Sequence, residues 1–201
     1  MPLLLFCGVS AAALLPIDFR EELQAHTASK VSHLRTEKGI EMAVQFGDAF
    51  RKEVFNGVSI QYELALILNQ NGDLDKAYDR YTEILAGDPD HVPSLYDRGE
   101  ILLLQGEYEA ASVDLRKLLS LRPEEWVVHF RLAEIAGYQE DPSQMEYHIL
   151  KALRHGFLLS SLVESGQHWH TWSKHPTLGL ILKQIFLLYG SESLWLQLQQ
   201  H

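Results

Sequence analysis

The chain has 201 residues, the size of one domain or of one domain with extensions, and its 46% apolar and 22% charged residues exclude disorder over the whole length and a polytopic membrane protein. Its 17 Lys and Arg against 27 Asp and Glu give a net charge of −10, which argues against nucleic acid and anionic membrane surfaces as partners. Cys7 is the single cysteine, so a disulfide within the chain and a cysteine-based zinc site are both excluded.

The first 17 residues carry no charged side chain, and Leu3–Leu15 has the length of a signal-peptide core. No Lys or Arg precedes this stretch, and it is shorter than the roughly 20 apolar residues that span a bilayer. The chain also lacks an Asn-x-Ser/Thr acceptor for glycosylation. We therefore expect residues 1–17 to form an apolar helix packed on the rest of a cytoplasmic protein. The alternatives are a cleaved signal of a secretory or luminal protein, and a membrane or partner anchor.

A repeat of 34 residues organises the middle of the chain. Sliding one unit onto the next, residues 58–91 onto 92–125, gives eight identities, including Gly72 with Gly106. Self-similarity at a fixed period of this length is the sequence signature of stacked repeats. The middle of the chain is therefore predicted to consist of equivalent supersecondary units.

Each unit has the pattern of two antiparallel helices. In the first unit, apolar residues recur at helical spacing from Val58, and Gly72 is predicted to end this helix because glycine tolerates the left-handed conformation of a helix end. Asp73 is a candidate N-cap for a second helix, in which the small Ala77 lets the two helices cross closely. Pro89 cannot extend that second helix, and the next unit repeats the same plan.

This pattern resembles the tetratricopeptide repeat (TPR), which has small residues where its helices cross, Gly at the turn, an aromatic residue in the second helix and Pro at the end. The residues that carry the resemblance are Ala65, Gly72, Leu74, Ala77, Tyr81 and Pro89 in the first unit, and Gly99, Gly106, Tyr108, Ala111, Leu115 and Pro123 in the second. The resemblance implies an all-α fold in which helix pairs stack into a right-handed superhelix, an α-solenoid.

Units on either side match the repeat less well. Residues 126–159 keep Ala133 in the first helix, but Met145 replaces the small residue of the second helix, so a wider helix crossing is expected there. Residues 18–57 retain little beyond Ala43 and are predicted to form a helix pair that acts as a degenerate repeat or a cap. Terminal units of a repeat array are usually atypical, so the three TPR-like units are predicted to end at residue 159.

Residues 160–201 are predicted to form a C-terminal helical cap. Pro176 opens a strongly apolar segment that runs to Tyr189, and such a helix is expected to be buried. Gly190 is predicted to end it, and Ser191–Gln199 to form a last short helix.

A cluster of histidine and tryptophan precedes this apolar helix. His168, His170 and His175 lie within eight residues and are candidate ligands for Zn²⁺ or Cu²⁺. Their spacing does not suit one helical face. We therefore expect a turn in which Trp169 and Trp172 pack under the C-terminal helix while the histidines lie at the surface, and we expect no metal or other cofactor.

The sequence motifs of common enzymes are missing. The chain contains neither a glycine-rich phosphate-binding loop nor a Gly-x-Ser-x-Gly nucleophile motif. Cys7 lies in an apolar run, where a reactive thiolate is disfavoured. The sequence therefore predicts a protein that is not an enzyme.

The TPR resemblance implies that a partner binds in the concave groove lined by the first helices of successive units. The residues that it places there are Tyr62, Leu66, Asn69, Tyr96, Glu100, Phe130 and Glu134. Aromatic side chains are common interface anchors, and the glutamates favour a partner with Lys or Arg beside its apolar anchors. The alternative is that the aromatic side chains only fill the space between adjacent repeats.

One group of known TPR ligands is not expected. The TPR co-chaperones of Hsp70 and Hsp90 hold acidic C-terminal tails with Lys and Asn side chains, at groove positions where this chain has Tyr62 and Leu66. Glu100 and Glu134 would in addition repel a terminal carboxylate. The resemblance therefore implies a different partner from these tails.

The sequence thus predicts a non-catalytic scaffold or adaptor that holds an extended or helical segment of another protein. Two alternatives remain open. In the first, the apolar ends Leu3–Leu15 and Leu178–Leu188 dock against other subunits of a stable assembly; in the second, the chain is a luminal chaperone-like TPR protein. An adaptor is expected to be a soluble monomer, whereas an isolated assembly subunit is expected to aggregate.

Overall fold

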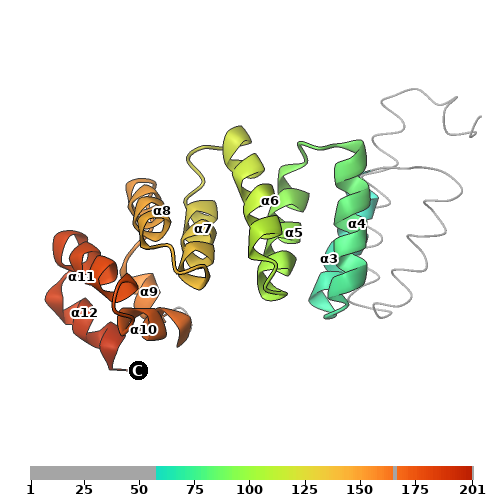
Figure 1. Cartoon of the computed structure of the whole chain (residues 1–201). Coiled ribbons are helices and arrows are strands. Elements are labelled where there is room, and N and C mark those ends of the chain that lie inside the picture. The colour runs from blue at the N-terminus through green and yellow to red at the C-terminus, as the bar shows by residue number, and fades with distance from the viewer. Residues whose placement is uncertain (1–57, 165–166, 201) are drawn as a thin grey trace, which may run out of the picture. The chain divides into compact units, whose positions relative to one another are not determined.

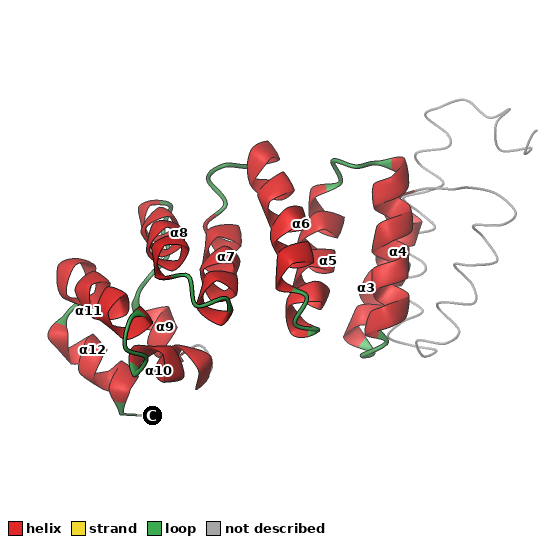
Figure 2. Cartoon of the chain, viewed as in Figure 1, coloured by secondary structure: helices red, strands yellow, loops and turns green. Residues whose placement is uncertain are grey.

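The structure, a computed structural model, describes residues 58–164 and 167–200 (Figure 1). The predictions for residues 1–17 and 18–57 lie outside these described residues, as does Cys7. All regular structure in the described ranges is helical (Figure 2). The chain divides into two compact units, Met1–Ser94 and Leu95–His201.

The described part of the first unit is a helix pair, α3 (Val58–Gln70) and α4 (Leu74–Gly87). Apolar residues at helical spacing give each helix one buried face, which follows the rule that such faces pack on one another. The apolar side chains that these faces bury almost completely are Ile60, Leu64, Ala65, Ile67 and Leu68 from α3 and Ala77, Tyr81, Ile84 and Leu85 from α4.

A glycine with positive φ ends α3, as predicted. Gly72 has a φ of 85°, and the amide of Asp73 donates to the carbonyl oxygen of Leu68 at 3.0 Å. This bond is the signature of a Schellman helix end, which satisfies carbonyl groups that the helix leaves free. Asp73 stands at the N-cap of α4 but makes no side-chain capping bond there.

The second unit continues the helix pairs and then changes character. Helix α5 (Val92–Leu104), whose first turn belongs to the first unit, is followed by α6 (Tyr108–Leu121), α7 (Trp126–Tyr138) and α8 (Pro142–Arg154). Four shorter helices complete it: α9 (Ser160–Glu164), α10 (Gln167–Ser173), α11 (Leu178–Tyr189) and α12 (Glu192–Gln199).

One apolar core joins α7 and α8 to the C-terminal helices. Trp169 and Phe186 are fully buried at its centre, and Trp172 is 8% exposed. Because these side chains come from α10 and α11, the C-terminal segment completes the core of the last helix pair. The C-terminal helices therefore cover part of the apolar surface of α7 and α8.

The large Met145 fits into the α7–α8 contact because the residue opposite is small. Met145 is fully buried, and a Cβ atom added at Gly137 would lie 2.7 Å from its Cε atom and 2.7 Å from the Trp172 ring. Glycine on α7 thus provides the space that the repeat usually gains from a small residue on the second helix.

Two C-terminal elements differ from the prediction. The expected turn around the histidines is instead helix α10, because Trp169 and Trp172 lie three residues apart and bury the same face. Helix α11 is buried only on one side, since Leu180, Leu187 and Leu188 are 63%, 52% and 76% exposed. Across the described ranges, no helix is both long enough and apolar enough to cross a membrane.

Candidate functional site

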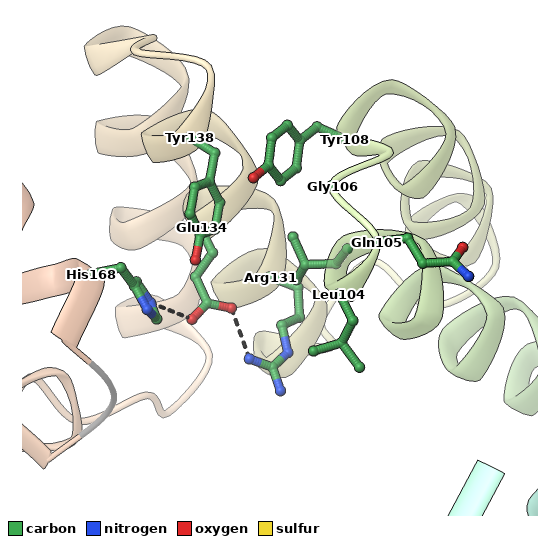
Figure 3. Close-up of a pocket in the computed structure, with 9 residues that line it drawn as sticks. Leu104, Gln105, Gly106, Tyr108, Arg131, Glu134, Tyr138 and His168 are labelled. Atoms are coloured by element: carbon green, nitrogen blue, oxygen red, sulfur yellow. Dashed lines mark hydrogen bonds and ion pairs between the residues drawn. The ribbon is translucent and has the colours of Figure 1, made fainter. Parts of the chain in front are cut away.

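A pocket of about 470 Å³ opens in the second unit, between the turn that follows α5 and one side of α7 (Figure 3). Three kinds of side chain meet in it: charged groups from α7, tyrosine rings and leucines. Its lining residues are Leu103, Leu104, Gln105, Gly106, Tyr108, Arg131, Glu134, Tyr138 and His168.

The charged groups form a ladder that crosses three helices. Arg131 Nε lies 2.8 Å from Oε1 of Glu100 on α5, and its Nη1 donates to Glu134 Oε2 at 2.7 Å. The second oxygen of Glu134 lies 2.9 Å from Nε2 of His168. Figure 3 marks both contacts of Glu134 with dashed lines. Since two carboxylates face one guanidinium, the part of the ladder formed by Glu100, Arg131 and Glu134 carries an excess of one negative charge.

Burial strengthens the electrostatic interactions along this ladder. Burial by itself lowers the pKa of Arg131, but Glu134 and Glu100 outweigh it and raise that pKa, so the guanidinium stays charged. Burial raises the pKa of Glu100, an effect that Arg131 opposes and the negative charge of Glu134 reinforces. A second cation at this place would meet a partly desolvated, negatively charged site.

An aromatic wall stands beside the ladder. The rings of Tyr108 and Tyr138 stack with their centroids 4.9 Å apart and their planes at 7°. The edge of the Tyr138 ring also packs on Trp172, at 4.9 Å and 81°, which fixes the ring on α7. Burial and then the negative charge of Glu134 raise the pKa of Tyr138, so its hydroxyl stays neutral and can donate. Leu104, which is 74% exposed, adds an apolar side chain at the edge of the pocket.

The structure brings together three of the predicted groove residues. Glu134 lines the pocket, and Glu100 pairs with Arg131. The Tyr96 hydroxyl interacts with the same guanidinium, while burial, followed by the charge of Glu100, raises the pKa of Tyr96. The 34-residue spacing that placed both glutamates on one face therefore corresponds to a real juxtaposition around Arg131.

Three other predicted groove residues belong to the first unit. Tyr62, Leu66 and Asn69 are half-buried on α3 in the first unit, where the Tyr62 ring packs on Tyr81 at 6.0 Å and on His91 at 5.3 Å.

Phe130 belongs to the core rather than to the pocket. It is 8% exposed and packs between Phe157, at 5.0 Å, and Trp169, at 5.6 Å. Because both neighbours lie outside the first helices of the repeats, the repeat pattern gave no sign of their presence.

The three candidate metal ligands have separate partners. His168 contacts Glu134, His170 Nδ1 contacts the carbonyl oxygen of Leu198, and His175 Nδ1 accepts from the amide of Leu178. Within residues 58–164 and 167–200, no three or more His, Cys, Asp or Glu side chains gather as a metal site requires. His168 instead contributes to the pocket.

Sequence reasoning missed Arg131, Tyr108, Tyr138 and Leu104 as site residues. Arg131 carried a usable signal, since it is a cation three residues before Glu134 on the same predicted helix, at a spacing that allows an ion pair. The stacking of Tyr108 on Tyr138 had no comparable signal, because it joins α6 to α7 across a loop.

Comparisons with known proteins identify the fold. A family model described as tetratricopeptide repeat matches residues 68–113. The Photosystem I assembly protein Ycf3 of Acaryochloris marina is 40% identical over 68 residues, which make up 33% of this chain and 41% of that protein. The matched segment thus spans about two fifths of this curated relative.

Solved structures extend the similarity along the chain. YrrB, described as a TPR protein with an unusual peptide-binding site, has a TM-score of 0.66 at 12% identity, covering 92% of this chain and 96% of YrrB. MamA from Desulfovibrio magneticus RS-1 has a TM-score of 0.65 at 18% identity, and the match covers 84% of this chain and 97% of the MamA chain.

These similarities, with the observed helix pairs, define an all-helical repeat protein. The chain carries tetratricopeptide repeats, which confirms both the resemblance and the predicted fold class. TPR proteins are protein-interaction scaffolds and are typically non-catalytic.

Proposed function

We propose that this chain is a non-catalytic scaffold that anchors a segment of a partner protein in the pocket beside α7, and that this segment carries Lys or Arg next to an apolar residue. The observation that carries the proposal is the excess negative charge of Glu100 and Glu134 over Arg131, next to an exposed leucine and a stacked tyrosine pair. The names of two similar proteins, an assembly protein and a TPR protein with a peptide-binding site, support an interaction role.

Recognition would combine three terms. The ammonium or guanidinium group of the partner pairs with the ladder, where desolvation makes a charge pair stronger than on an open surface. Tyr138 is 41% exposed, so the stacked Tyr108–Tyr138 pair offers aromatic surface for a cation–π contact, and Leu104 covers the apolar stem of the partner's side chain. A partner that presents a carboxylate meets repulsion, so acidic tails are disfavoured.

The first test identifies which peptides bind, without assuming a particular partner. A library of random peptides displayed on phage is selected on the full-length wild type, and the enriched peptides are synthesised for calorimetry. We expect enrichment of Lys or Arg next to Leu, Phe or Tyr. Leu104→Lys and Tyr138→Ala are each expected to weaken binding about 10-fold or more, because one repels the cation and the other removes an anchor.

The matched control is Leu158→Lys, which adds the same charge at another exposed leucine of the second unit, 67% exposed and outside the pocket lining. This variant is expected to bind like the wild type. Enrichment of acidic peptides, or equal loss of affinity in Leu104→Lys and Leu158→Lys, would contradict the proposal.

A second candidate function is that of a subunit docked through α11. Leu180, Leu187 and Leu188 are exposed on this helix, and Lys183 is its only charged residue. Single exposed leucines are ordinary, but several on one short helix suggest a covered face. Sedimentation velocity of Leu180→Gln with Leu188→Gln tests this candidate. If α11 docks on a second copy of this chain, the wild type self-associates and the variant does not. If the wild type is a monomer, docking on a second copy is excluded and only docking on a different subunit is left.

A further inference from the structure

Two buried histidines face each other across the α7–α8 contact. His129 on α7 and His148 on α8 are 5% and 6% exposed, and their Nδ1 atoms lie 3.0 Å apart. Neither residue lines the pocket, and neither belongs to the histidine cluster around α10. A hydrogen bond at this distance needs one ring that donates through Nδ1 and one ring that accepts there.

The surroundings assign the two roles. The Pro123 backbone raises the pKa of His129, so it favours a hydrogen on the ring nitrogen that does not face His148; since Nδ1 faces His148, that nitrogen is Nε2. A neutral His129 with hydrogen on Nε2 accepts at Nδ1. His148 must therefore carry its hydrogen on Nδ1 and donate it to His129.

The charged groups that act on this pair are basic. Lys151 and His155, on and just after α8, act on His129, and the His155 ring stacks on it at 6.1 Å and 8°. Arg116 from α6 acts on His148. Burial, followed by His129 and Arg116, lowers the pKa of His148 to about 4; burial also lowers the pKa of His129. The folded α7–α8 contact thus favours neutral rings.

We propose that the His129–His148 pair is a proton-operated release device: two protons open the α7–α8 contact and thereby free the partner held beside α7. One added proton leaves a donor and an acceptor between the rings, so the hydrogen bond persists. Two protons place N–H groups on both facing Nδ1 atoms, with no acceptor between them. Opening of the α7–α8 contact therefore requires that the histidine pair takes up two protons.

The link to the pocket follows from the geometry of α7. Arg131, Glu134 and Tyr138 are spaced by three and four residues and share one face, whereas His129 lies about half a turn away and faces α8. Displacing α7 from α8 therefore displaces the pocket residues as one group. This consequence rests on the proposed function, whereas the opening itself does not.

The sign of the pH effect follows from the lowered pKa values. Histidine in an open or unfolded chain has a pKa near 6.5, so below that pH the open form binds more protons than the folded one. The contact is complete above about pH 6.5 and is lost as the pH falls toward 4. With up to two protons involved, the opening constant is expected to rise about 10- to 100-fold per pH unit in this range.

Hydrogen exchange of the full-length protein tests the opening. Protection factors, corrected for the intrinsic pH dependence of exchange, are measured from pH 7.5 to 4.5 on amides of α7 and α8, with α3 and α4 as internal reference. In the wild type, we expect the opening constant of α7 and α8 to rise about 10- to 100-fold for each pH unit that the pH falls. In His148→Gln, one histidine fewer takes up a proton, so this pH dependence is expected to weaken by about one proton. In the double variant His129→Gln with His148→Gln, it is expected to disappear.

His175→Gln is the matched control, since it removes a histidine outside the pair, and it is expected to keep the wild-type slope. Imidazole nitrogen NMR of the wild type gives a readout that does not depend on the variants folding: both rings must be neutral at pH 6.5, with hydrogen on His148 Nδ1. Two rings that titrate near pH 6.5, or a double variant with the wild-type slope, would overturn the device.

Binding of a phage-selected peptide at pH 7 and pH 5 tests the second part of the proposal, the release of the partner. A large loss of affinity in the wild type that the double variant lacks supports partner release. Acid-induced opening with unchanged affinity would overturn the release of the partner while leaving the opening intact. If no peptide is selected at all, the proposed function fails, and the exchange result still decides on the opening.

Discussion

Three helix pairs end their first helix in the same left-handed turn, but with different residues. Gly72 and Gly106 have φ values of 85° and 79°, whereas Glu140 occupies the equivalent place at 54°. The following amide, that of Asp141, donates to Ala136 at 2.8 Å, so the turn is preserved despite the side chain. A non-glycine residue in this region carries steric strain.

We expect Glu140→Gly to stabilise the protein, because it removes this strain from the third helix pair. The expected gain in the free energy of unfolding is about 0.5–1 kcal/mol, after the larger conformational entropy of glycine in the unfolded chain is subtracted. Urea unfolding followed by circular dichroism measures it.

Gly106→Ala is the mirror control for this turn. No atom lies within 4 Å of a Cβ added at Gly106, so the substitution changes backbone strain without a clash. It is expected to destabilise the protein by about 1 kcal/mol. If both substitutions shift the unfolding midpoint in the same direction, the strain at Glu140 is not the controlling term.

At the scale of helices, the sequence predicted what depends on the repeat period and missed what depends on its neighbours. The helix pairs of residues 58–125 follow from local signals: apolar spacing, Gly72 and Gly106 at the turns, and proline after the second helices. Helix α10 was expected to be a turn, because the spacing of its histidines does not suit one helical face. The helix forms because Trp169 and Trp172, three residues apart, are buried on one face in the same core as α11.

The same distinction explains the candidate site. Glu100 and Glu134 were found because they repeat at the period of the fold and point to one face. Phe130 repeats equally well, yet the C-terminal cap covers it with Trp169 and Phe157. A period describes how repeats resemble one another, and it carries no information on the segment that closes the last repeat. The buried His129–His148 contact was missed for a related reason, since it depends on side chains that no other unit shares.

At the scale of the whole molecule, net charge and local charge act in the same direction. The chain carries a net charge of −10, and the ladder beside α7 has one more carboxylate than guanidinium. A basic partner is therefore attracted at long range and paired at short range. The two contributions differ in how salt affects them, because exposed charges are screened by ions and the half-buried ladder is screened much less.

Salt should therefore slow the association of a basic peptide with this protein more than it speeds dissociation. Raising NaCl from about 0.05 M to about 0.5 M shortens the screening length from roughly 14 Å to roughly 4 Å. We expect the association rate constant to fall about 10-fold or more and the dissociation rate constant to change by less, as surface plasmon resonance can measure. The same peptide with Gln in place of each Lys and Arg is the control, and its association rate should be almost independent of salt. An association rate that does not respond to salt for either peptide would mean that the acidic surface plays no part in capture, and apolar contacts with Leu104 and Tyr138 would have to account for recognition.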